Sequence, residues 1–111
     1  MEPETKRQVI ANCRRAAGRA VAKPHKWTPH QVELPHLAGF YFSEPGAWDL
    51  IADRLEANEV FELIELDKPP GALALTMTFE IDPKRAHLYI KIQIGASNRV
   101  FGRSFHYSDF K

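Results

Sequence analysis

The sequence has little of several features that define common protein classes. Its 111 residues include a single cysteine, Cys13, which excludes an internal disulfide, whereas small secreted domains usually depend on such bridges. No run of about 18 apolar residues occurs, as a membrane-spanning helix requires, and no apolar stretch follows the first residues as in a signal peptide. We therefore expect a protein of the reducing cytoplasm, without a membrane segment.

An excess of one charge and several catalytic motifs are lacking as well. The 15 Lys and Arg residues nearly balance 14 Asp and Glu residues, for a formal net charge of +1, so the chain as a whole is neither a basic nor an acidic scaffold. There is no glycine-rich phosphate loop, zinc-protease motif or nucleophile elbow. The spacing of His25, His30 and His36 does not suit paired metal ligands. We expect no metal and no cofactor, and the sequence assigns no other role to these histidines.

What is present is the composition of one folded domain. Hydrophobic residues make up 44% and charged residues 26% of the chain, close to the globular average, and we expect residues 1–111 to form a single domain. The charges are unevenly placed. Residues 1–30 carry seven basic and two acidic side chains, residues 31–68 carry two and nine, and residues 69–111 carry six and three. Basic ends therefore flank an acidic middle segment.

Helical periodicity predicts a first helix over residues 4–22, where apolar side chains recur at Val9, Cys13, Ala16 and Ala20. The opposite arc of this helix is basic, with Arg7, Arg14, Arg15, Arg19 and Lys23. Such an arc is either an ordinary solvated surface or a track for an RNA backbone. On the second interpretation, four of these arginines are candidate substrate-binding residues: Arg7, Arg14, Arg15 and Arg19.

A second helix is predicted to begin after Ser43, a favourable N-cap, and to end near Asn58, a residue that suits the left-handed conformation in which a chain leaves a helix. Its buried stripe comprises Trp48, Ile51, Ala52 and Leu55. The proline-rich segment between the helices predicts an irregular path, with a short extended stretch over residues 37–42. The aromatic residues of this region are more typical of core packing than of base stacking; they are Trp27, Phe40, Tyr41 and Phe42.

After Asn58 the hydrophobic period becomes two, which predicts four strands over residues 60–66, 73–81, 87–94 and 100–107. The connections are too short for parallel crossovers, so we expect an antiparallel meander. The predicted fold class is α+β: two N-terminal helices packed on one face of a four-stranded antiparallel β-meander. The other face of the sheet is then open and polar.

Alternation in the third strand places His87, Tyr89, Lys91 and Gln93 on the open face. In the last strand we expect Phe101 and Phe105 to face the helices, which leaves Gly102, Ser104 and His106 beside the polar row. Arg103 and Tyr107 share the Phe face by strict alternation, but a bulge or the strand end would bring them to the rim.

The polar side chains of the open face suit chemistry on a phosphodiester. Histidine is the side chain best suited to take or give a proton near neutral pH, so His106 is the candidate acid or base, while Lys91 and Arg103 would stabilise charge on a phosphate. With Ser104 they form the candidate catalytic set, and Tyr89 and His87 are candidate substrate-binding residues. An RNA 2′-hydroxyl would then attack its own phosphate without a metal. The alternative is that these side chains have no catalytic role and form the solvated face of an ordinary sheet.

The order of elements over residues 44–111, with the segments at residues 87–94 and 100–108, resembles the small ribonuclease toxins of bacterial toxin–antitoxin systems, in the MqsR-like and RelE-like superfamily. The positions that carry the likeness are Lys91, Arg103, Ser104 and His106, with Tyr107 unassigned. The resemblance implies an open sheet face that cleaves RNA without metal, and a cognate antitoxin protein as partner. A second copy of the chain, in a homodimer, is a further candidate partner.

A non-enzymatic alternative remains at this point. The chain would be a protein-interaction module, such as a phage or mobile-element accessory protein, or an antitoxin or immunity protein. Its motivation is the acidic stretch formed by Asp49, Asp53, Glu56, Glu59, Glu62 and Glu65. Salt dependence separates the two, because RNA binding through Lys and Arg weakens steeply with salt and a largely apolar protein interface does not.

Overall fold

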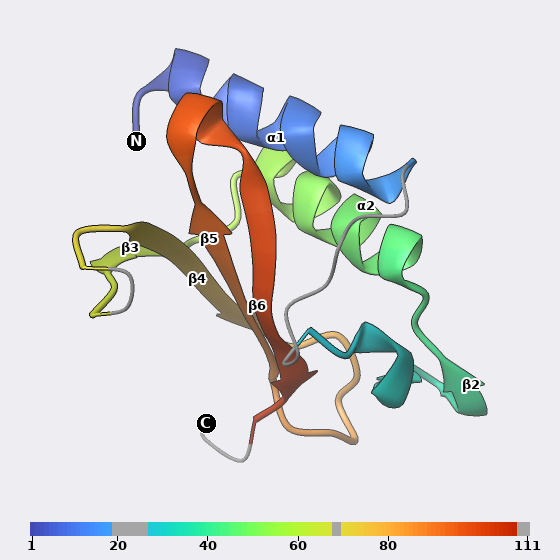
Figure 1. Cartoon of the computed structure of the whole chain (residues 1–111). Helices are drawn as coiled ribbons and strands as arrows, with labels where there is room; N and C mark the ends of the chain where they lie inside the picture. Colours follow the sequence, from blue (N-terminus) through green and yellow to red (C-terminus); the bar gives the residue numbers. More distant parts are fainter. Residues whose placement is uncertain (19–26, 68–69, 109–111) are drawn as a thin grey trace.

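The computed structural model describes residues 1–18, 27–67 and 70–108. Its elements, shown in Figure 1, are α1 (Pro3–Ala17), β1 (Glu33–Leu34), β2 (Leu37–Tyr41), α2 (Glu44–Glu56), β3 (Glu62–Glu65), β4 (Leu73–Phe79), β5 (Leu88–Ile94) and β6 (Val100–Tyr107). The last four strands form one antiparallel sheet in the order β3-β4-β5-β6, and β1 and β2 form a separate two-stranded sheet. The predicted α+β class and antiparallel meander are confirmed.

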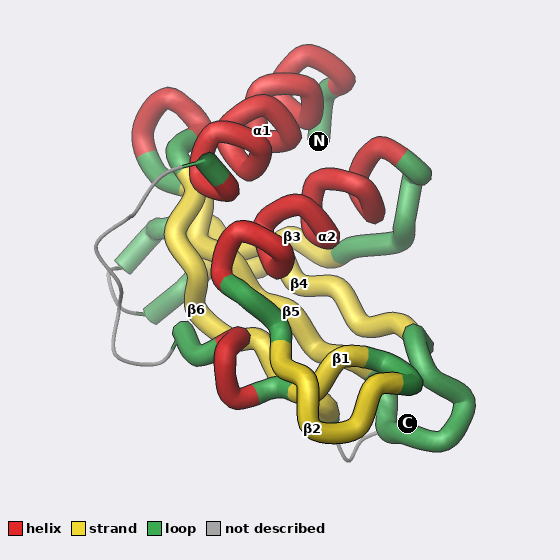
Figure 2. Tube along the Cα trace, turned by 90° about the vertical axis from the view of Figure 1, so that its right-hand side faces the viewer, coloured by secondary structure: helices red, strands yellow, loops and turns green. Residues whose placement is uncertain are grey.

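The two helices pack side by side on one face of the large sheet (Figures 1 and 2). They do not both precede the strands, however, because the β1–β2 hairpin lies between α1 and α2. That part of the prediction was wrong. The stretch expected over residues 37–42 is β2, but its partner β1 has only two residues, too few for any alternation to be visible in the sequence. His36, with a φ of 60°, makes the turn between them.

Helix α1 is shorter than its hydrophobic pattern suggested. It ends at Ala17 instead of residue 22, because Gly18 closes the last turn with a hydrogen bond from its backbone N–H to the Arg15 carbonyl oxygen at 3.2 Å. Val9 and Cys13 are buried as expected. Arg19 and Lys23 lie outside the described residues.

Helix α2 follows the prediction closely. The Ser43 hydroxyl oxygen accepts a hydrogen bond from the backbone N–H of Gly46 at 3.0 Å, which satisfies one of the free donors of the first turn. The chain leaves the helix through Asn58 at a φ of 60°, the left-handed conformation that asparagine tolerates. All four residues of the predicted stripe are buried: Trp48, Ile51, Ala52 and Leu55.

The core lies between the helices and the sheet. β4 contributes Leu75 and Met77, and the central strand β5 contributes the fully buried Leu88, Ile90 and Ile92. Aromatic rings close the end of this layer, with Trp27 packed on Trp48 (ring centroids 5.1 Å apart) and Phe42 on Phe105 (5.0 Å).

The prediction of core packing is thus confirmed for Trp27 and Phe42. It was wrong for Phe40 and Tyr41, which are 65% and 52% exposed on β2. Both lie in a hairpin at the periphery of the molecule, which the helix and sheet layers do not cover (Figure 1).

Candidate functional site

The face of the sheet opposite the helices carries an ordered set of polar side chains. One cross-strand row runs through all four strands, from Glu62 through Thr76 and Lys91 to Ser104. The next row runs from Thr78 through Tyr89 to His106. Because neighbouring strands lie about 4.8 Å apart, these register positions place Lys91, Ser104, Tyr89 and His106 on adjoining points of one surface.

A β-bulge brings Arg103 to this surface. Lys91 opposes Ser104, but the next residue, Ile92, opposes Gly102, so Arg103 is an extra residue in β6. Its Nη1 donates a hydrogen bond to the Gln93 side-chain oxygen at 3.2 Å. The bulge therefore decides the position that alternation left ambiguous, and it gives the open face a second cation.

The same bulge reverses the faces expected for the residues before it. Phe101 pairs with Gln93 on the open face and is 37% exposed, while Gly102 pairs with Ile92 and is buried beneath Trp27. The prediction that Phe101 faces the helices and Gly102 the polar row was wrong, because strict alternation does not survive an inserted residue.

One hydrogen bond indicates which nitrogen of a neutral His106 ring carries the hydrogen. Its Nδ1 lies 3.1 Å from the Tyr107 carbonyl oxygen. A carbonyl oxygen only accepts hydrogen bonds, so Nδ1 donates, and in the neutral ring Nε2 carries the free lone pair. In a neutral ring, Nε2 is thus the nitrogen that can accept a hydrogen bond or a proton.

Tyr89 lies beside this imidazole, whereas His87 lies two residues further along, opposite Ser108. The ring of Tyr89 packs against that of His106, with centroids 5.4 Å apart. Burial raises the pKa of Tyr89, and the negative charge of Glu62 adds to the shift, so the phenol stays protonated at neutral pH. His87 comes directly before β5, where its carbonyl oxygen accepts from Ser108 N at 2.7 Å.

Lys91 is half-buried at the centre of the row. Among the described residues, none forms a hydrogen bond or an ion pair with its ammonium group. An ammonium without an internal partner can be matched by an anion from outside, such as a phosphate.

The basic residues of α1 do not share this surface, because α1 lies in the helix layer on the other side of the sheet (Figure 2). Arg14 is held by three carboxylates of α2: its Nη2 lies 2.7 Å from Asp53 and 3.0 Å from Glu56, and its Nη1 lies 3.4 Å from Asp49. These hydrogen bonds, that with Asp53 first, raise the pKa of Arg14 above its ordinary value. Arg14 therefore ties the two helices together.

Arg7 and Arg15 are exposed on α1, and Arg19 lies outside the described residues. The structure thus brings together the predicted catalytic set and Tyr89, and it does not bring the helix arginines to the same face. An RNA strand on Lys91 would have to pass around the sheet edge to reach them.

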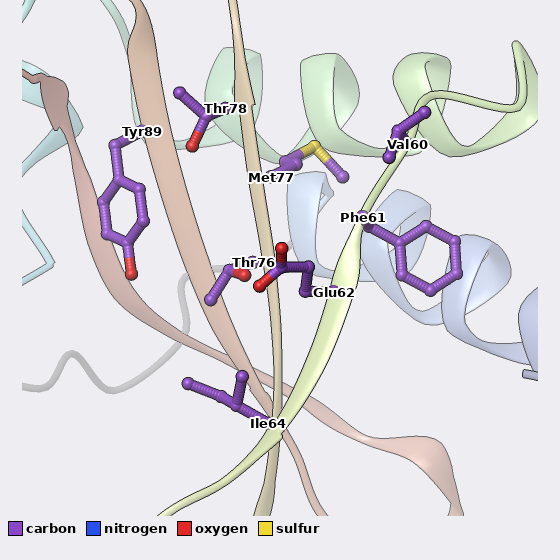
Figure 3. Close-up of a pocket in the computed structure, with 8 residues that line it drawn as sticks. All are labelled: Val60, Phe61, Glu62, Ile64, Thr76, Met77, Thr78 and Tyr89. Atoms are coloured by element: carbon purple, nitrogen blue, oxygen red, sulfur yellow. The ribbon is translucent and has the colours of Figure 1, made fainter. Parts of the chain in front are cut away.

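A shallow groove adjoins the polar rows at the β3 edge (Figure 3). It has a volume of about 380 Å³, and its walls include Glu62 and Ile64 of β3, Thr76 and Thr78 of β4, and Tyr89 of β5. Sequence reasoning grouped Glu62 only with the acidic stretch. Alternation within residues 60–66 was the missed signal, since it places Glu62 and Ile64 on the face of Thr76.

Among the residues that the structure describes, the histidines of the proline-rich segment form no common site. His36 pairs with Asp82 (Nδ1 to Oδ1, 3.6 Å), His30 is exposed, and His25 lies outside the described residues. Within residues 1–18, 27–67 and 70–108, no three His, Cys, Asp or Glu side chains are grouped as a metal site would need.

No protein-family model, curated protein or solved structure shows significant similarity to the chain. In the part of the chain that the structure describes, neither helix has the length and apolar character needed to cross a membrane.

Proposed function

We propose that this protein is a metal-independent endoribonuclease of the kind found among toxin–antitoxin ribonucleases, and that the open sheet face is its active surface. One observation carries the proposal. Lys91, Ser104 and His106 occupy neighbouring register positions on one uncovered face, and the bulge adds Arg103 to them. A base can deprotonate the ribose 2′-hydroxyl of RNA, and cations and a hydroxyl can stabilise the charge that develops on the phosphate during transphosphorylation.

The reaction follows from the positions of these groups. Nε2 of His106 takes the proton of a ribose 2′-hydroxyl, and the 2′-oxygen attacks the adjacent phosphorus. The bond from phosphorus to the 5′-oxygen breaks, leaving a 2′,3′-cyclic phosphate and a 5′-hydroxyl. The imidazolium returns its proton through solvent to the departing oxygen, so His106 ends neutral. No metal takes part in any step.

Lys91 and Arg103 stabilise the charge that develops on the phosphate oxygens, and the Ser104 hydroxyl donates to one of them. Tyr89 offers an aromatic face to a base. His87, the second candidate for substrate binding, lies two residues before Tyr89, directly ahead of β5. Arg14 is assigned to helix packing, because three carboxylates occupy its guanidinium.

The test is cleavage of total RNA by purified protein in excess chelator. We expect fragments ending in 2′,3′-cyclic phosphate, and a loss of rate of about 10²-fold or more for His106→Ala. Lys91→Met should also be slow. The matched controls are His30→Ala and Lys84→Met, both at exposed positions away from the open face, and they should cleave at the wild-type rate. Intact RNA, or an unchanged rate for His106→Ala, would contradict the proposal.

A protein-interaction function remains the second candidate, on a different surface from the one first considered. Most of the acidic stretch is engaged internally: Asp49, Asp53 and Glu56 bind Arg14, and Glu59 lies 3.6 Å from Arg54. The observation that favours this candidate is the β1–β2 hairpin, where Leu37, Phe40 and Tyr41 are all more than half exposed.

The partner for this hairpin would be a protein that adds an extended segment along β2, and this function does not require the chain to cleave RNA. Co-expression with the product of the adjacent reading frame tests it. We expect co-purification to fail for Phe40→Ser and to persist for His106→Ala. Retention of the partner by Phe40→Ser would remove the hairpin from consideration.

A further inference from the structure

We infer that the groove at the β3 edge is a subsite for a guanine base, read by the carboxylate of Glu62. The inference rests on the proposed function, since it names the nucleotide that the ribonuclease would hold beside its reacting groups. It concerns residues that lie next to the candidate catalytic set but are not part of it.

The groove has the dimensions and the lining of a small-molecule site. Its volume of about 380 Å³ lies at the lower end of the ~300–1,000 Å³ typical of such sites. Figure 3 shows the Glu62 carboxylate beside Thr76, with Ile64 below it and the Tyr89 ring on the far side. The lining therefore combines one carboxylate, two threonine hydroxyls and the Tyr89 ring with four apolar side chains, those of Val60, Phe61, Ile64 and Met77.

Glu62 is exposed, and no described residue forms an ion pair or a hydrogen bond with its carboxylate. Its charge nevertheless acts across the groove, because it contributes to the raised pKa of the Tyr89 phenol. Both Glu62 and Tyr89 line the groove, so the carboxylate and the aromatic ring border the same space.

The chemistry of a carboxylate selects among the four bases. An ionised carboxylate only accepts hydrogen bonds, and it can accept two at once. Guanine presents two adjacent donors, N1–H and the N2 amino group, on its Watson–Crick edge, whereas adenine, cytosine and uracil each place an acceptor beside a donor. Unstacked RNA bases are commonly read on this edge while they stack on an aromatic side chain, a role that Tyr89 fits.

The groove is continuous with the candidate catalytic groups. Thr76 in its floor is the register partner of Lys91, and Tyr89 in its wall packs on His106. A guanine in the groove would therefore have its own phosphate within the reach of Lys91 and His106. We expect cleavage beside guanine.

The experiment measures nucleotide binding, so that it does not depend on cleavage. Amide chemical shifts of Thr76 and Tyr89 are followed by NMR during titration with 3′-GMP, 3′-AMP, 3′-CMP and 3′-UMP. We expect 3′-GMP to bind at least about tenfold more tightly than the other three. Glu62→Gln, which replaces one acceptor by a donor, should remove this preference. Glu65→Gln is the matched control, because Glu65 is exposed on the same strand but on the opposite face.

Each outcome has one meaning. Equal affinities for the four nucleotides, no binding at all, or a guanine preference that survives in Glu62→Gln would overturn the subsite, even where RNA is cleaved. A guanine preference that depends on Glu62, found together with intact RNA in the cleavage assay, would overturn the ribonuclease and keep the subsite. The amide spectrum of Glu62→Gln shows whether that variant is folded.

Discussion

Gly102 lies directly against the indole ring of Trp27. A Cβ atom at Gly102 would overlap the Cδ2 and Cε2 atoms of that ring, far inside van der Waals contact. The bulge at Arg103 is the cause, since it turns Gly102 toward the helix layer. The contact joins the segment before the β1–β2 hairpin to the strand that carries Ser104 and His106.

We expect Gly102→Ala to lower the free energy of unfolding by about 1–3 kcal/mol, the usual cost of overpacking a closed core. The Trp27 ring cannot move aside easily, because it is 3% exposed and packed on Trp48 and Phe105. Urea denaturation followed by tryptophan fluorescence measures the effect. Gly18→Ala is the control, since a Cβ there meets only the Arg15 carbonyl oxygen at 3.7 Å. Equal stability of Gly102→Ala and wild type would contradict the packing described.

Asp82 joins the hairpin to the loop between β4 and β5. Its carboxylate is 3% exposed and accepts hydrogen bonds from the backbone N–H of Lys84 at 3.0 Å and of His36 at 3.2 Å. Arg85 Nε lies 3.5 Å away, and Arg85 also reaches Glu33 of β1 at 3.5 Å. These contacts, the Lys84 amide first, hold the pKa of Asp82 below its ordinary value.

This lowered pKa predicts a loss of stability in acid. Because the unfolded chain binds the proton more readily than the folded one, the ionised carboxylate stabilises the fold fully above about pH 4. That stability is lost as the pH falls through the lower pKa of the folded state. Denaturation series from about pH 7 to about pH 2 should show a weaker acid dependence for Asp82→Asn than for wild type. Asp67→Asn, at an exposed position, should keep the wild-type slope, and an unchanged slope for Asp82→Asn would contradict the prediction.

The Cys13 thiol should be unreactive toward thiol reagents in the folded protein. Burial in the helix interface raises the pKa of its thiol to about 12, although the charge of Arg14 acts in the opposite direction. The thiolate is the reactive form, so a disulfide reagent at neutral pH should modify Cys13 only as fast as the protein unfolds. The same reagent should react fully in guanidinium chloride. Rapid modification of the native protein would show that α1 opens without global unfolding.

Much of the fold was predictable from short-range sequence signals, because the conformation that they favour is not overruled by tertiary contacts. The N-cap at Ser43, the left-handed exit at Asn58 and the stripe from Trp48 to Leu55 each depend on neighbours within one or two turns. The four strands were predicted because period-two patterns and turn residues are themselves local. The end of α1 was misjudged, because the apolar spacing in the sequence gives no sign that Gly18 caps the helix after Ala17.

The candidate site was predictable only in part. Lys91, Ser104 and His106 lie on one face as alternation requires, but alternation could not place Arg103, Phe101 or Gly102, since one inserted residue changes the face of everything before it. Alternation within residues 60–66 places Glu62 on the open face, but the groove that it shares with Thr76 and Tyr89 could not be predicted, because these residues lie 14 and 27 positions away in the chain.

By itself, the order of residues determined the fold class. It showed which segments form helices and strands, which side of each is apolar, and that a polar sheet face remains uncovered. Short-range sterics and the burial of apolar groups suffice for that. Tertiary structure alone decided three features: the bulge at Arg103, the ion pairs of Arg14 with α2, and the groove between Glu62 and Tyr89. Each depends on how distant segments fit together, and packing of that kind has no periodicity along the chain.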